Sequence, residues 1–204
     1  LRQALLFTMT APGIPVIYYG TEQGFIERRS SMFAEGYGSN GRDHFDTTSD
    51  LFRYTQAVIE LRKENPIFAR GALQPLPGDP DSPGLLAYKR SYQGQQALML
   101  FNTADAPLLV DGYDTGLPGG SVLQNLFGLQ RQDDVVIGAD GTLTTELAAR
   151  EGLVLLASGD VISVTTETDE GPTVALASLA DDTYTDDITL TGTTSEPGTV
   201  IKIA

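Results

Sequence analysis

Hydrophobic residues follow several different patterns along the chain. Apolar residues dominate positions 1–9, which predicts the end of a helix, and Pro12–Gly13 then predicts a turn. Residues 14–19 form an apolar run, rich in β-branched and aromatic side chains, without polar alternation. Such a run predicts a short strand that is buried on both faces, as in a parallel sheet covered by helices. The polar residues 20–23 then lie where this strand ends.

A helical pattern follows a polar loop at residues 25–46. Apolar side chains recur at helical spacing between Leu51 and Leu61, and the preceding Thr-Thr-Ser-Asp offers N-cap candidates. Arg62 and Lys63 suit the negative end of the helix dipole, and Asn65-Pro66 ends the helix. We expect an amphipathic helix that packs against a sheet.

From about residue 73 the pattern becomes that of short strands separated by Gly, Asn, Asp and Pro. The expected strands are 85–90, 97–102, 108–113, 122–127, 135–137, 143–147 and 153–157. No helical segment separates them, so we predict antiparallel pairing and a β-sandwich over residues 73–158. This gives four regions: residues 1–70, the sandwich, a polar linker at 159–172, and a β-rich stretch at 173–204.

The last region carries an unusually acidic sequence. Strands are expected at 173–177, 188–192 and 200–203, with Asp181, Asp182, Asp186 and Asp187 between the first two. A calcium site is one interpretation of these carboxylates, but no loop offers the spacing that six to eight converging oxygens need. We favour a solvated acidic face.

Composition excludes several classes of protein. The chain has 204 residues, with 27 acidic against 13 basic side chains and a net charge of −14, which disfavours nucleic acid or an anionic membrane as partner. It has no cysteine, so it holds no disulfide and no thiolate metal site. No apolar run approaches the roughly 20 residues that a membrane helix needs. Because Leu1 is not an initiator methionine, we expect the chain to begin inside a longer protein.

Residues 36–41 spell G-x-G-x-x-G, a pattern typical of dinucleotide binding. That chemistry needs a strand directly before the glycines and a helix that begins within them, and neither context is present. We interpret these glycines as turn formers.

The stretch Gly13-Ile-Pro-Val-Ile-Tyr-Tyr-Gly-Thr-Glu22 resembles the last barrel strand of the α-amylase family, glycoside hydrolase family 13. The resemblance implies that residues 1–70 are the end of a (β/α)8 barrel (last strand, loop and helix) and that residues 73–158 are the antiparallel domain C. Residues 191–200 resemble the opening of bacterial immunoglobulin-like repeats, which implies a truncated module of that kind at 173–204.

The same resemblance implies an enzyme that hydrolyses α-1,4-glucans, such as starch and maltodextrins, by retaining two-carboxylate chemistry. In this family the catalytic carboxylates come from earlier barrel strands, so we expect none of them in this chain and expect the chain alone to be inactive. Glu22 and Tyr19 then have a supporting role in the active site. Arg29, Arg28 and His44 are the substrate-binding candidates.

These assignments leave alternatives open. The family's Asp four residues before the substrate-binding Arg is missing, since Phe25 precedes Arg29 and Gly24 precedes Arg28 at that spacing. Only Glu27 is nearby, so a structural salt bridge is an equal interpretation. His44 also fits a packing or capping role. Tyr18, Tyr19 and Tyr37 have faces that can stack on sugar rings, although core packing is the simpler role for the first two.

The Thr21-Glu22-Gln23 wording is shared with cyclodextrin glucanotransferases, so a glucan transferase is the first alternative function. A non-catalytic β-rich carbohydrate-binding or adhesion module is the second. The expected partners are an α-glucan and the remainder of the chain's own barrel. By resemblance we expect a secreted, extracellular protein, without a cofactor in this chain but with calcium allowed in the parent enzyme.

Overall fold

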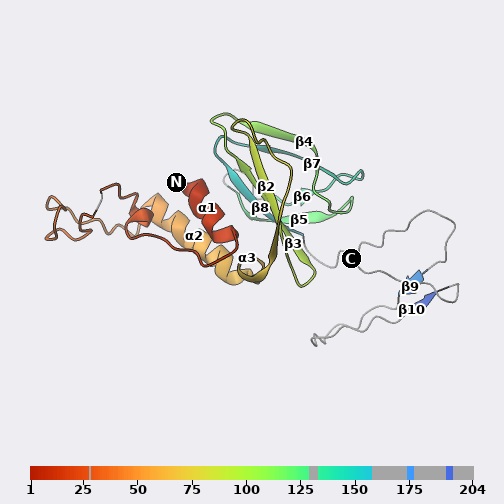
Figure 1. The fold of residues 1–204 in the computed structure, drawn as a ribbon, viewed down its shortest axis with the longest axis horizontal. Coiled ribbons are helices and arrows are strands. Elements are labelled where there is room, and N and C mark those ends of the chain that lie inside the picture. The colour runs from red at the N-terminus through yellow and green to blue at the C-terminus, as the bar shows by residue number, and fades with distance from the viewer. Residues whose placement is uncertain (28, 129–132, 158–173, 177–191, 195–204) are drawn as a thin grey trace. The chain divides into compact units, whose positions relative to one another are not determined.

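The computed structural model describes residues 1–27, 29–128, 133–157, 174–176 and 192–194. They fall into two compact units, Leu1–Val161 and Ile162–Ala204, each of which is described by itself. In its described residues, the first unit begins with three α-helices and one 3-10 helix, η1, and continues with eight strands (Figure 1). The helical elements are α1 (Arg2–Thr10), η1 (Thr21–Gln23), α2 (Asp50–Glu64) and α3 (Pro66–Arg70). The strands are β1 (Ala72–Pro75), β2 (Leu85–Tyr92), β3 (Gln95–Asn102), β4 (Leu108–Asp114), β5 (Val122–Phe127), β6 (Val135–Val136), β7 (Thr142–Leu147) and β8 (Gly152–Ala157).

The strands of this unit form two antiparallel sheets. Six strands pair in the order β1-β2-β3-β8-β5-β6, and β4 pairs with β7. The β2–β3 hairpin turns at Gln93 and Gly94, whose φ angles of +48° and +78° are those of a type I′ turn. The predicted antiparallel pairing is confirmed, and all seven predicted strands are present with bounds that differ by at most two residues. The sequence analysis did not predict β1.

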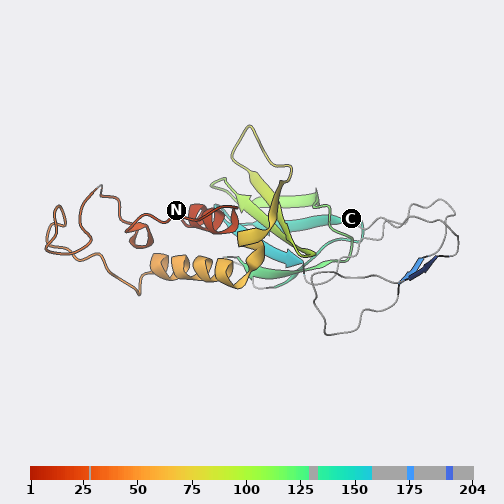
Figure 2. The same ribbon diagram turned by 60° about the horizontal axis from the view of Figure 1, so that its bottom comes forward.

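The centre of the six-stranded sheet, at β3 and β8, is buried on both faces. Successive strand residues point to opposite sides, so one strand contributes to two cores. Leu98 and Leu100 of β3 join side chains of β4 and β7 in one cluster, while Met99 and Phe101 join α1, α2 and α3 in the other. Figure 2 shows α1 and α2 side by side next to the sheet. This double coverage explains the unbroken apolar run from Ala97 to Phe101.

Helix α2 begins and ends where the sequence predicts. The Ser49 hydroxyl accepts a hydrogen bond from the Phe52 backbone N–H at 3.3 Å, the geometry of an N-cap. The helix ends at Glu64, and Pro66 occupies the first turn of α3, where its missing N–H costs nothing. The sequence analysis did not predict α3, because only five residues form it.

The prediction of a buried strand at residues 14–19 is wrong for this structure. The segment has no regular secondary structure, and the exposed fractions of Ile14, Val16 and Tyr18 are 92%, 80% and 66%. Among the described residues no strand pairs with it, so it has neither a hydrogen-bond ladder nor two covered faces. The apolar pattern is present, but the neighbours that turn such a pattern into a strand are not among these residues.

The second unit is described only at β9 (Val174–Leu176) and β10 (Gly192–Thr194), which pair antiparallel with Gly192 opposite Leu176. The strand predicted at 173–177 therefore contains β9, whereas β10 begins at the last residue of the strand predicted at 188–192. The expected strand at 200–203 and the four aspartates considered for calcium lie outside the described residues.

Candidate functional site

The predicted site begins at a tight turn that follows residues 14–19, which we call the extended segment. Gly20 has a φ of +81°, and its carbonyl accepts hydrogen bonds from Gln23 and Phe25. A Cβ atom at Gly20 would lie 2.7 Å from the Cβ of Phe25, closer than any side chain allows. Only glycine fits both the backbone angle and this contact. The turn therefore brings Phe25 back against the end of the extended segment.

Phe25 lies at the centre of a row of aromatic rings. The ring centroids of Tyr18 and Tyr19 are 4.5 Å apart, Tyr19 and Phe25 are 6.3 Å apart, and Phe25 meets His44 edge-on at 4.8 Å. The Tyr19 hydroxyl donates to the carbonyl of Ser30 at 3.2 Å. The neighbouring Tyr18 raises the pKa of Tyr19. The structure thus brings two predicted site residues, Tyr19 and His44, into one row.

The loop between Gly24 and Phe45 is closed by a side chain. The Gln23 carboxamide donates to the Asp46 carbonyl at 3.2 Å and accepts from the Asp46 N–H at 3.1 Å. Inside the loop Met32 and Ser39 are buried, and the Met32 carbonyl accepts the His44 N–H at 2.9 Å. The loop is longer than an ordinary connection in a compact domain, and ordered loops of this length are usually functional. The glycines at 36–41 lie in its turns, as predicted.

Glu22, the other residue expected to support the active site, lies at a groove beside α2. Its side chain lines an open groove of about 530 Å³ beside α2, with Ile17, Phe52, Ile59 and Lys63 among the lining residues. The groove is mostly apolar, so it is suited to a packed neighbour rather than to a chain of sugars. Glu22 of η1 therefore lies at the edge of a groove that α2 also lines.

Of the two candidate arginines, the structure describes only Arg29. Arg29 is exposed, has a φ of +61°, and makes no hydrogen bond or ion pair with described residues. The alternative salt bridge with Glu27 is not among the described ion pairs, and the Glu27 carboxylate instead accepts the Ile26 N–H at 3.2 Å. Arg28 lies outside the described residues. Tyr37, the further stacking candidate, is 87% exposed at the tip of the loop.

Three residues that shape this site were missed by the sequence analysis. Gln23 closes the loop, and Arg62 and Arg90 bind the backbone from which the extended segment departs. Gln23 had a visible signal, since it stands directly after Glu22 in the motif. The two arginines had none, because their partners are backbone carbonyls far away in sequence.

The described residues contain no group of three or more His, Cys, Asp or Glu side chains that is placed to hold a metal ion. In the same part of the chain, no helix is both long enough and apolar enough to cross a membrane.

Comparison with known proteins shows which proteins the chain is related to. The cyclomaltodextrin glucanotransferase of Bacillus sp. (strain 17-1) is 29% identical over 184 residues, a match that covers 86% of this chain and 24% of that protein. The α-amylase of Streptomyces lividans is 32% identical over 184 residues, which cover 80% of this chain and 19% of that protein. The chain is a relative of glycoside hydrolase family 13. No protein-family model matches it.

The fold of the chain is also similar to that of a solved α-amylase structure. The crystal structure of an Anoxybacillus α-amylase matches with a TM-score of 0.58 and 26% identity, over 78% of this chain and 33% of that chain. The chain thus spans about a fifth to a quarter of the length of the curated relatives named above. What those complete proteins do comes to this chain only as a proposal.

Proposed function

We propose that this chain is the C-terminal part of an α-amylase-like enzyme that hydrolyses α-1,4-glucans by retaining two-carboxylate chemistry. In this proposal residues 1–70 complete a (β/α)8 barrel, residues 73–158 are domain C, and residues 173–204 open an immunoglobulin-like module. The catalytic carboxylates belong to barrel strands outside this chain.

One observation carries the proposal: the family-like segment at 14–19 pairs with no strand in the described part of the chain, and it exposes Ile14, Val16 and Tyr18. Side chains of this kind are normally covered in a folded protein, and a contiguous exposed apolar surface marks a binding face. The neighbouring strands and helices of a barrel are the cover that this sequence fits best. The groove beside α2, which Ile17 and Glu22 line, then receives another part of the same barrel.

The aromatic row supports a position of these residues beside the substrate. Aromatic faces bind the apolar faces of sugar rings, and Tyr18, Tyr19 and His44 reach one another through Phe25. We assign Glu22 and Tyr19 to active-site support, and His44, Arg28 and Arg29 to substrate binding. Arg29 has its donors free for vicinal hydroxyls, because no described residue engages them.

The test is expression of the complete polypeptide, obtained by extending the coding sequence in the 5′ direction, with an assay on soluble starch. We expect release of reducing ends and retention of anomeric configuration by the complete protein, and no turnover by the present chain. Absence of turnover by the complete protein would leave a non-catalytic β-rich binding module as the function. Turnover by the present chain would contradict the placement of the carboxylates.

A glucan transferase of the cyclodextrin glucanotransferase type is the second candidate, favoured by the relative from Bacillus sp. (strain 17-1). The two candidates differ in the acceptor, which is water for the hydrolase and a sugar hydroxyl for the transferase. Chromatography of the products distinguishes linear maltooligosaccharides from cyclic ones.

The proposal includes secretion and gives this chain no metal or cofactor of its own. Any calcium of the parent enzyme is placed in other parts of the polypeptide. Chelation tests this point: it should leave the thermal unfolding of the present chain unchanged, and a lower midpoint would contradict it.

A further inference from the structure

The C-terminal end of α1 leaves backbone carbonyls without partners inside the helix, as every helix does. Two arginines from other elements bind them. Arg62 of α2 donates to the carbonyls of Met9 at 2.7 Å and Ala11 at 3.0 Å. Arg90 of β2 donates to the carbonyl of Thr10 at 2.6 Å. Three successive carbonyls are thus held by two guanidinium groups.

Each arginine also reaches beyond the helix. Arg62 donates to the carbonyl of Gly13 at 2.7 Å, in the turn from which the extended segment departs. Arg90 donates to the carbonyl of Gly71 at 2.6 Å, so it ties α1 to the junction of α3 and β1. A forked donor can join two carbonyls of different elements in this way, whereas a lysine ammonium cannot reproduce the planar fork.

The charges make this arrangement unusual. Arg90 is completely buried, and the one ion pair among the described residues joins Arg150 and Asp105, away from it. Burial lowers the pKa of Arg90, and the positive charge of Arg62 lowers it further. The negative end of the α1 dipole is the compensation that the structure offers both cations. Packing alone would be served better by an apolar side chain, so the arginines are best explained by the carbonyls that they hold.

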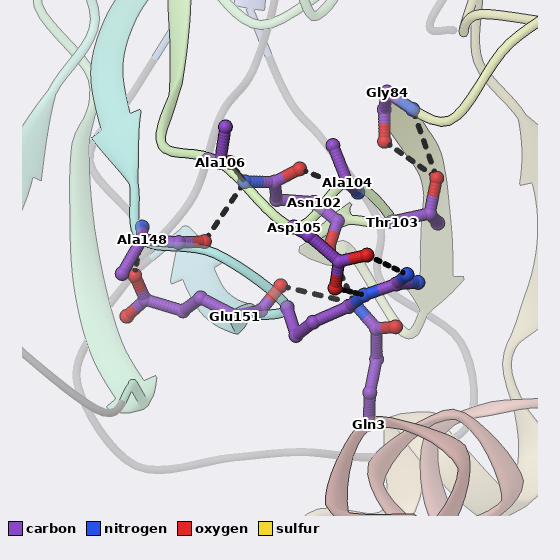
Figure 3. A network of polar contacts seen from close by, with 10 residues as sticks. Gln3, Gly84, Asn102, Thr103, Ala104, Asp105, Ala106, Ala148 and Glu151 are labelled. Carbon is purple, nitrogen blue, oxygen red and sulfur yellow. Dashed lines mark hydrogen bonds and ion pairs between the residues drawn. The ribbon is translucent and has the colours of Figure 1, made fainter.

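The rest of α1 is fixed on the same sheet. The Tyr88 hydroxyl lies 2.6 Å from the Thr10 hydroxyl at the C-terminal end of the helix. Near the other end, the Gln3 carboxamide donates to the carbonyls of Asn102 at 2.9 Å and Glu151 at 3.3 Å (Figure 3). With both ends held, the direction in which the chain leaves α1 depends on the turn that Arg62 binds.

We propose that Arg62 and Arg90 are positioning residues for the candidate site, because they hold the Met9–Gly13 backbone and thereby set where the Tyr18–Gln23 turn lies. They do not touch substrate. Through Arg90, the proposal gives strand β2 a part in orienting the binding groups. It rests on the proposed function only where substrate binding is the readout.

The first experiment uses the chain itself. Because the chain has no cysteine, spin labels can be placed at Thr21→Cys in η1 and Glu60→Cys in α2. We expect a narrow distance distribution in this parent and a distribution at least twice as wide after Arg62→Ala, with Arg62→Lys in between. Arg53→Ala, an exposed arginine of the same helix, is the control for lost charge, and Val58→Ala, a buried side chain of α2, is the control for lost stability. A distribution that Arg62→Ala leaves unchanged, or that Val58→Ala widens equally, would overturn the proposal.

The second experiment uses the complete polypeptide and a maltooligosaccharide. Misplaced binding groups raise KM, whereas loss of folded enzyme lowers kcat and leaves KM as it was. We therefore expect Arg62→Lys to raise KM three- to tenfold with kcat within twofold, and Arg53→Lys to change neither. A fall in kcat alone would make Arg62 merely structural. If the complete polypeptide has no glucan activity, the proposed function fails, but the spin-label result still decides the positioning role.

Discussion

The Gln23 side chain pairs with the backbone of Asp46 as one strand pairs with another, donating to its carbonyl and accepting from its N–H. This two-way contact closes the loop of residues 24–45 with a single side chain. A carboxamide offers a donor and an acceptor side by side, whereas a carboxylate offers acceptors alone. The position of His44 beside Phe25 depends on this closure, since both rings lie within the closed loop.

Gln23→Glu should open this loop without disturbing the sheets. The carboxylate cannot donate to the Asp46 carbonyl, and its charge would face that oxygen, at a cost of about 1–2 kcal/mol. We expect tryptic cleavage within the loop, after Arg28, Arg29 or Arg42, to be roughly ten times faster. Gln74→Glu, at an exposed position of β1, is the matched control. Equal cleavage rates in both variants would show that the pair does not hold the loop.

Gly20→Ala should be more harmful than the same change at Gly41. Both glycines have positive φ, +81° and +71°, so both substitutions carry similar backbone strain. A Cβ at Gly20 meets Phe25 at 2.7 Å, whereas nothing lies within 4 Å of a Cβ at Gly41. We expect Gly41→Ala to lower the free energy of unfolding by about 1 kcal/mol, from backbone strain alone. We expect Gly20→Ala to lower it by about 2–4 kcal/mol, because the steric clash adds to the strain.

Ring-current shifts of the His44 imidazole protons report the effect of Gly20→Ala, because we expect the new Cβ to push Phe25 away from the imidazole. Urea unfolding compares the two variants. If both variants lose the same free energy of unfolding, Phe25 moves aside without cost and the close contact does not contribute to stability.

The sequence predicted the sheets because their strands satisfy local rules. The apolar run of β3 and the Gln93–Gly94 turn carry enough information to define a hairpin. Ser49 and Asn65 likewise define α2 from its ends. Residues 14–19 satisfy the same apolar pattern as β3 but are not a strand here. A pattern records what a segment needs as neighbours, and it does not say which residues provide them.

The candidate site was less predictable for the same reason. Glu22, Tyr19 and His44 were found through motif wording and residue type, and the structure joins only the last two, through Phe25. Arg62 was correctly placed in the last turn of α2, but its true partners are carbonyls some fifty positions earlier. No periodicity reports a contact of that kind.

Asn102 should prove essential to the junction between the two sheets and α1 (Figure 3). Its side chain is fully buried, donates to the carbonyls of Ala106 at 2.7 Å and Ala148 at 2.9 Å, and accepts the Ala104 N–H at 2.9 Å. Asn102→Ala leaves these groups unpaired, and we expect a loss of about 2–4 kcal/mol in the free energy of unfolding.

Asn102→Asp gives the sharper result, because it keeps the shape and exchanges the donor for an acceptor. A carboxylate would face two carbonyl oxygens, so only the protonated acid, which donates, fits the site. This raises the pKa of the new carboxyl in the folded state, and the variant should become more stable as the pH falls. Urea unfolding at neutral and acidic pH measures this trend, with the exposed Asn40→Asp as control. Equal pH dependence in the two variants would contradict the buried-donor role.

Two tyrosines should make the first unit sensitive to alkali. Burial raises the pKa of Tyr88 to about 12, and burial likewise raises the pKa of Tyr54 to about 12. Their ordinary value is 10.0, which we take for the unfolded chain. Between these two values the unfolded chain has released the proton and the folded chain still holds it. The unfolded state therefore binds fewer protons, and the free energy of unfolding must fall as the pH rises from 10 to 12.

Each such tyrosine contributes a slope of at most about 1.4 kcal/mol per pH unit. Tyr88→Phe removes one of them, so we expect its stability to decline less steeply in this window, although the loss of the contact with the Thr10 hydroxyl lowers its stability at neutral pH. Tyrosinate absorbance should show late-ionising tyrosines, with one fewer in this variant than in Tyr37→Phe, whose lost ring is exposed and which keeps both Tyr54 and Tyr88. If the alkaline slope is the same in both variants, Tyr88 ionises freely and the interface between α1 and β2 is open to water.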